Sequence, residues 1–192
     1  MGYFHDFTAP LRELFAGNLL FFLCCLFYLA WWLICFKPGA SAGSAGGIFL
    51  AFAFLAGIAA VIALSDGIRA LAPLSKTLPV RYILLGAAAA YLILLAVTVS
   101  FFHRPATSEL LIMHIWAALE LAAVAVLHGT GRFGAGRAGT LTALVGAATA
   151  AGVICYVLYY RLGSTASYVD GMVPLASDAL VTAAFLGILA VS

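Results

Sequence analysis

The chain has 192 residues, of which 66% are hydrophobic and 8% charged, whereas soluble domains carry roughly 25% charged residues. This composition excludes a water-soluble globular protein. The net charge is only +2, and the basic residues are too dispersed to suggest a nucleic-acid partner. A bilayer core about 30 Å thick needs about 20 apolar residues per helix, so the chain has room for six spans. We therefore predict an all-α polytopic integral membrane protein whose main partner is the lipid bilayer.

Residues 1–17 predict a short amphipathic helix at the membrane interface. Thr8 suits an N-cap, and Pro10 is tolerated in a first helical turn. Charged residues lie off a stripe of apolar residues at helical spacing. That stripe consists of Phe4, Phe7, Leu11, Leu14 and Phe15. We divide the chain into this interfacial segment and a six-helix transmembrane domain, residues 18–192.

Six apolar runs follow, and each is long enough to cross a bilayer. The breaks between them carry Gly, Pro, Ser or charged residues, which favour turns. The predicted spans are residues 18–36, 47–72, 82–102, 106–127, 138–160 and 172–191. Aromatic residues near the end of the first span, such as Tyr28, Trp31 and Trp32, are typical of an interfacial belt.

The basic residues predict the orientation, because cytoplasmic loops are enriched in Lys and Arg. Six of them fall on the side of the N-terminus and three on the other side. The six are Arg12, Arg69, Lys76, Arg81, Arg132 and Arg137; the three are Lys37, Arg104 and Arg161. We expect both termini in the cytoplasm and the protein in the plasma (inner) membrane.

Small residues on the fifth span allow close approach of another helix. They are Gly139, Ala143, Gly146, Ala147, Ala150, Ala151 and Gly152. We expect this span inside the bundle. The same face, or residues 87–90 of the third span, would equally serve a homo-oligomer or a partner membrane subunit.

Glu120 is the acidic residue that the span boundaries place near the middle of the bilayer. An ionisable residue at that depth costs about 2.5 to 3.5 kcal/mol on insertion scales, so it needs protonation, a partner or water. Structural and functional interpretations both stay open. Glu109, Met113, Trp116 and Glu120 share one face of the fourth span at spacings of four, three and four. This stripe predicts a lining for a cationic or amphipathic ligand, with the Trp116 ring attracting the cation.

His114 and Asp178 are predicted at similar depths on the fourth and sixth spans. A pair between them would remove much of the cost of burying each, and it would face an outward-opening cavity. Thr182 lies one turn beyond Asp178 and is positioned to support its carboxylate. A structural pair and a ligand site are both compatible with this spacing.

We predict no cofactor and no metal. The four cysteines fall inside or at the edge of apolar runs, without a Cys-x-x-Cys pair. His114 and His128 have the fourteen-residue spacing seen in two-haem cytochromes of the b type, but the two further histidines, His5 and His103, do not lie on a facing span. Signatures of hydrolases, metalloproteases and nucleotide-binding loops are absent.

In size and number of spans the chain is similar to substrate-binding subunits of energy-coupling-factor transporters and to small six-helix urea or amide channels. No motif accompanies this similarity, so no binding residues are transferred from it. We expect a small-molecule transport or substrate-binding component with an outward-facing intramembrane cavity. Two alternatives stay open: a membrane-embedded enzyme acting on a lipid or apolar substrate through His114, Glu120 and Asp178, and an accessory or assembly subunit.

Overall fold

The computed structural model describes residues 9–36, 44–75, 80–103, 108–161 and 165–191, and all regular structure in these ranges is helical. Six of the helices are long and apolar enough to cross a membrane. This confirms the predicted all-α, six-span membrane fold. The helices are α1 (Ala9–Phe36), α2 (Ser44–Leu71), α3 (Val80–Phe102), α4 (Ser108–Gly129), α5 (Ala135–Arg161) and α6 (Thr165–Ala190), with the 3-10 helix η1 (Ala72–Leu74) after α2.

The first span is longer than predicted. α1 runs without a break from Ala9 to Phe36, so residues 9–17 are its first turns and not a helix of their own. Pro10 lies in the first turn as predicted, and Thr8 lies outside the described residues. Leu11 and Leu14 of the apolar stripe are buried against other helices. The interfacial position of residues 1–17 stays a prediction.

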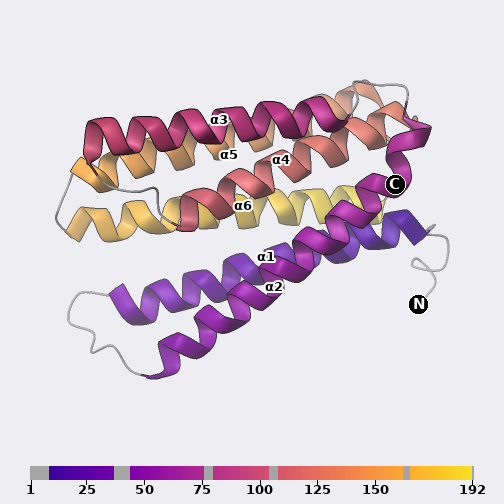
Figure 1. The fold of residues 1–192 in the computed structure, drawn as a ribbon. Coiled ribbons are helices and arrows are strands. Elements are labelled where there is room, and N and C mark those ends of the chain that lie inside the picture. Colours follow the sequence, from indigo (N-terminus) through magenta and orange to yellow (C-terminus); the bar gives the residue numbers. More distant parts are fainter. Residues whose placement is uncertain (1–8, 37–43, 76–79, 104–107, 162–164, 192) are drawn as a thin grey trace.

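The helices are arranged around α4. α1 and α2 form a long hairpin, α1 also lies along α6, and α6 packs on α5 (Figure 1). α4 contacts α2, α3, α5 and α6. Of its most apolar stretch, 61% is buried inside the protein, against 6% for α3. α4 is therefore the central helix, and α3 is the most peripheral.

The prediction that the fifth span lies inside the bundle is wrong. Gly139, Ala143, Gly146, Ala147 and Ala150 of α5 are exposed. Gly152 is the buried member of this set, and the Met113 side chain of α4 covers it. Small residues permit close packing only where another helix offers a matching surface, and the face of α5 that packs on its neighbours instead carries Ala138, Leu141, Val145 and Ala148.

Glycines bring α1 and α2 close together. A Cβ atom at Gly17 would lie 2.6 Å from Leu64 Cγ, and one at Gly67 would lie 2.9 Å from Leu14 Cγ. Each glycine thus faces a bulkier side chain of the other helix. The same arrangement recurs where Gly57 faces Cys24 and Gly46 faces Cys35. Because a glycine has no side chain, the two backbones approach closely along the hairpin.

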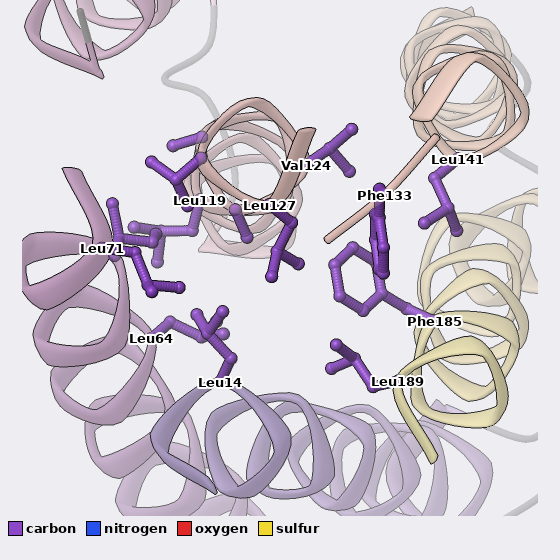
Figure 2. Close-up of a cluster of buried hydrophobic side chains, with 14 of the residues drawn as sticks. Leu14, Leu64, Leu71, Leu119, Val124, Leu127, Phe133, Leu141, Phe185 and Leu189 are labelled. Atoms are coloured by element: carbon purple, nitrogen blue, oxygen red, sulfur yellow. The ribbon is translucent and has the colours of Figure 1, made fainter. Parts of the chain in front are cut away.

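Apolar side chains fill the end of the bundle where α1 begins and α6 ends (Figures 1 and 2). Leu14 of α1, Leu64 of α2 and Leu127 of α4 meet Phe185 and Leu189 of α6 there. None of these five side chains is exposed. The interior at this end of the bundle is therefore lined by apolar side chains.

Candidate functional site

A layer of three side chains joins α1, α4 and α6 in the interior. The rings of Phe21 and Trp116 stack with their centroids 6.0 Å apart, and Trp116 Nε1 donates a hydrogen bond of 3.0 Å to Thr182 Oγ1. The Thr182 hydroxyl in turn donates to the Asp178 main-chain carbonyl at 2.7 Å. We call Phe21, Trp116 and Thr182 the aromatic layer. Because the Thr182 proton goes to a main-chain oxygen, the prediction that Thr182 supports the Asp178 carboxylate is wrong.

Two carboxyl groups are buried in the interior, one on each side of the aromatic layer. Glu120 and Asp178 are both 0% exposed. Their four carboxyl oxygens have no hydrogen-bond partner among the described residues. α4 and α6 run in the same direction (Figure 1). Glu120 lies four residues after Trp116, whereas Asp178 lies four residues before Thr182, so the two carboxyls are roughly 12 Å apart along the helix axes.

α1 carries one polar side chain on each side of the aromatic layer. It runs antiparallel to α6 (Figure 1), with the Trp32 ring lying over Gly171 near the start of α6. One turn from Phe21 in that direction is Cys25, on the Asp178 side of the layer. One turn in the other direction is Asn18, on the Glu120 side of the layer.

Asn18 is a residue that our sequence reasoning did not single out. It is fully buried, and its Nδ2 donates to the Leu14 carbonyl at 2.9 Å. Its Oδ1 has no hydrogen-bond partner among the described residues. The available signal was its rarity, because it is the only carboxamide side chain in the chain and it lies inside an apolar run.

The predicted pair of His114 and Asp178 is wrong. His114 Nε2 lies 2.6 Å from the Ala87 carbonyl oxygen of α3, and its ring packs against Tyr91 at 5.2 Å. Since a carbonyl only accepts, Nε2 carries the proton and donates. His114 precedes Trp116 by two residues, about 200° around α4, so it faces α3 while Trp116 faces α1 and α6.

His114 lines a groove of about 660 Å³ between α3, α4 and α5, which we call the α3 groove. Apart from His114 and Thr149, its lining is apolar and mostly small. Its walls include Ala87 and Ala90 of α3, Ala117 of α4, and Gly146 and Ala150 of α5. Gly146 and Ala150, two of the exposed small residues of α5, thus form one side of a groove instead of a tight helix contact.

A second cavity, of about 290 Å³, has an apolar lining from α1, α2 and α4. Neither cavity has Glu120 or Asp178 in its lining. Of the predicted ligand-binding stripe on α4, the described side chains of Met113, Trp116 and Glu120 are buried within the protein, and Phe21 covers one face of the Trp116 ring. Glu109 falls in the first turn of α4, and its side chain lies outside the described residues.

The described residues contain no cluster of three or more His, Cys, Asp or Glu side chains able to hold a metal ion. His128 Nδ1 lies 2.9 Å from the Phe133 carbonyl in the loop after α4. His114 lies on a different face of α4 from Glu120 and away from Asp178, so the three residues of the enzyme alternative do not come together. They therefore do not place an acid or a base next to a nucleophile.

The interior between α1, α4 and α6 is therefore a closed site that contains the carboxyl groups of Glu120 and Asp178. The α3 groove is an open site that contains the imidazole of His114. Comparison with protein-family models, with curated proteins and with solved structures finds no match to this chain. The assignment of function therefore depends on the geometry of these two sites.

Proposed function

We propose that this chain is a small-molecule transport component of a membrane, in which Glu120 and Asp178 carry exchangeable protons. The single observation behind this proposal is the burial of two carboxyl groups with no hydrogen-bond partner among the described residues. Leaving a buried polar group unsatisfied costs about 1 to 3 kcal/mol. Ionisable residues inside membrane bundles typically mark ion pathways and proton relays.

The positions of the two carboxyls suit transfer through the bundle. They lie on opposite sides of the aromatic layer, so a proton passing from one to the other has to cross Trp116. Breaking the hydrogen bond between Trp116 and Thr182 would let the indole rotate away. The aromatic layer then acts as the barrier between two half-pathways.

The α3 groove supplies the cavity that a small-molecule substrate needs. Its volume and mostly apolar lining fit an apolar or amphipathic molecule. Because His114 Nε2 donates to Ala87, the other ring nitrogen of the neutral imidazole is an acceptor for a donor group on that molecule. His114 is thus the proposed ligand contact in the groove.

The test uses the full chain in proteoliposomes with an imposed pH gradient and a trapped pH-sensitive dye. We expect the protein to dissipate the gradient faster than empty vesicles, and Glu120→Gln and Asp178→Asn each to return the rate to that of empty vesicles. Asp66→Asn is the matched control, because Asp66 is an exposed carboxylate near the end of α2. Wild-type rates equal to those of empty vesicles would reject the proposal.

We propose further that both termini are cytoplasmic and that the protein resides in the plasma (inner) membrane, on the strength of the six-to-three distribution of basic residues. Single cysteines at Ala40 and Ser167, in a background without the native cysteines, should react with an impermeant reagent from outside. One at Ser75 should not. The reverse labelling pattern would invert the orientation.

An accessory or assembly subunit is the second candidate function. The exposed residues Gly139, Ala143, Gly146 and Ala150 follow one face of α5 at spacings of four, three and four, which suits contact with a second copy or a partner helix. Cross-linking between cysteines placed at Ala143 in two copies would support self-association. A monomer that transports protons alone would exclude an assembly role.

A further inference from the structure

Three acceptor atoms without hydrogen-bond partners among the described residues lie on the same side of the aromatic layer. They are Asn18 Oδ1 and both carboxyl oxygens of Glu120, and both side chains are 0% exposed. One of the two Asn18 Nδ2 hydrogens goes to the Leu14 carbonyl. The amide therefore brings the acceptor Oδ1 and one further N–H donor.

The helix register places Asn18 and Glu120 at the same depth. Starting from the stacked rings of Phe21 and Trp116, Asn18 is three residues toward the start of α1, and Glu120 is four residues toward the end of α4. Because α1 and α4 run in opposite directions (Figure 1), both steps go the same way, by about 4.5 Å and about 6 Å.

Two apolar clusters include residues of both α1 and α4 on either side of this layer. Leu14, one turn before Asn18, and Val124, one turn after Glu120, belong to one cluster. On the other side, Phe21 and Trp116 share a second cluster. Asn18 and Glu120 thus occupy the layer between these two clusters.

Among the described residues, no Lys or Arg side chain is buried in this layer, and the α4 histidines bond elsewhere, His114 to Ala87 and His128 to Phe133. α6 contributes Asp178 and α1 contributes Cys25, both beyond the aromatic layer; α5 contributes Tyr156, which packs with Leu110 and Met113 near the start of α4. In α2, the groups are Asp66 and Arg69, and both are exposed. All the described arginines are exposed: Arg12, Arg69, Arg81, Arg132, Arg137 and Arg161.

The donor set fits a proton better than a metal ion. Hard metal cations take about six or more oxygen ligands, whereas these two side chains offer three oxygens. One proton suffices, because a protonated carboxyl group is both a donor and an acceptor. Its O–H group then has one acceptor at the same depth, Asn18 Oδ1.

We propose that Glu120 and Asn18 form a proton-binding site in which protonated Glu120 donates its hydrogen bond to Asn18 Oδ1. Loading takes a proton from water and forms the O–H bond of the carboxyl group; unloading breaks that bond and returns the proton to water. Ionisation of Glu120 removes this hydrogen bond, because the carboxylate oxygens and Asn18 Oδ1 are all acceptors. This site identifies the proton as the transported ion, and its role in transport rests on the proposed function.

Infrared spectroscopy of the full chain in lipid tests the site without any transport assay. We expect a carboxylic-acid C=O band that disappears in Glu120→Gln, a change that keeps the shape of the protonated acid. Asn18→Ala should shift this band to higher frequency, because the O–H group loses its acceptor. If Asn18→Ala folds poorly, the measurement is repeated on Asn18→Leu, because Leu is closer in volume to Asn. Asp178→Asn is the matched control and should leave the Glu120 band in place.

Two outcomes would overturn the site: no acid band that depends on Glu120 at any pH where the protein is folded, or a band that neither Asn18 variant shifts. The two proposals fail separately. A shifted acid band together with wild-type vesicles that hold their pH gradient keeps the site and rejects transport. Gradient dissipation without a band that depends on Glu120 keeps transport and rejects the site.

Discussion

Two faces of α4 show how differently the same helix is used. One face carries Met113, Trp116 and Glu120, which are fully or almost fully buried toward α1, α5 and α6. The other face carries His114, which lines the α3 groove between two helices that leave space beside it. The buried face holds polar groups in fixed surroundings, and the groove face leaves room for a molecule. Burial therefore separates a site suited to proton storage from one suited to ligand binding.

The largest difference between the two faces should follow removal of Trp116. Its ring is fully buried, stacks on Phe21 and bonds to Thr182. Trp116→Ala should lower the free energy of unfolding by about 3 to 5 kcal/mol, because burial of a large ring is lost and a cavity remains. His114→Ala on the groove face is the matched variant, and it should cost much less because the groove already leaves space there. Unfolding in mixed micelles measures both, and equal losses would contradict the comparison.

Glycines give the second contrast, between the α1–α2 hairpin and the α3 groove. A methyl group at Gly17 would meet the Leu64 side chain and backbone, whereas a Cβ at Gly146 has nothing within 4 Å. Gly17→Ala should destabilise the protein by about 1 to 3 kcal/mol through overpacking. Gly146→Ala should be neutral or slightly stabilising, because alanine favours the helix. Thermal unfolding in detergent measures both, and a harmless Gly17→Ala would mean that the hairpin packs less closely than described.

Two threonines give the smallest contrast. The Thr182 hydroxyl accepts from Trp116 Nε1, so Thr182→Val leaves a buried indole N–H unpaired and should cost about 1 to 2 kcal/mol. Thr149 Oγ1 donates only to the Val145 carbonyl of its own helix, and Thr149→Val should change stability by less than about 0.5 kcal/mol. Indole fluorescence should also change in Thr182→Val but not in Thr149→Val. An unchanged spectrum would remove Thr182 as the partner that holds Trp116.

The helices could be predicted from the sequence, because span length and the turn-forming breaks are local properties of the chain. The predicted spans 47–72 and 82–102 agree with α2 and α3 within a few residues. The position of Glu120 near the middle of its span was also predictable, since its distance from both ends of α4 follows from counting residues. The sequence did not indicate that α1 continues back to Ala9, because a helix with an apolar stripe looks alike at an interface and inside a bundle.

The neighbours of each helix were decided only by the tertiary structure. The composition of α5 suggested an interior helix, yet most of its small residues are exposed, while the glycines of α2 make the close contacts. His114 and Asp178 have similar predicted depths, but they point to different sides of α4. The depth of a residue in the membrane follows from its position along its helix, which can be counted in the sequence. The direction in which a side chain points, and therefore which side chains surround Glu120, depends on the rotation and order of helices that are far apart in sequence.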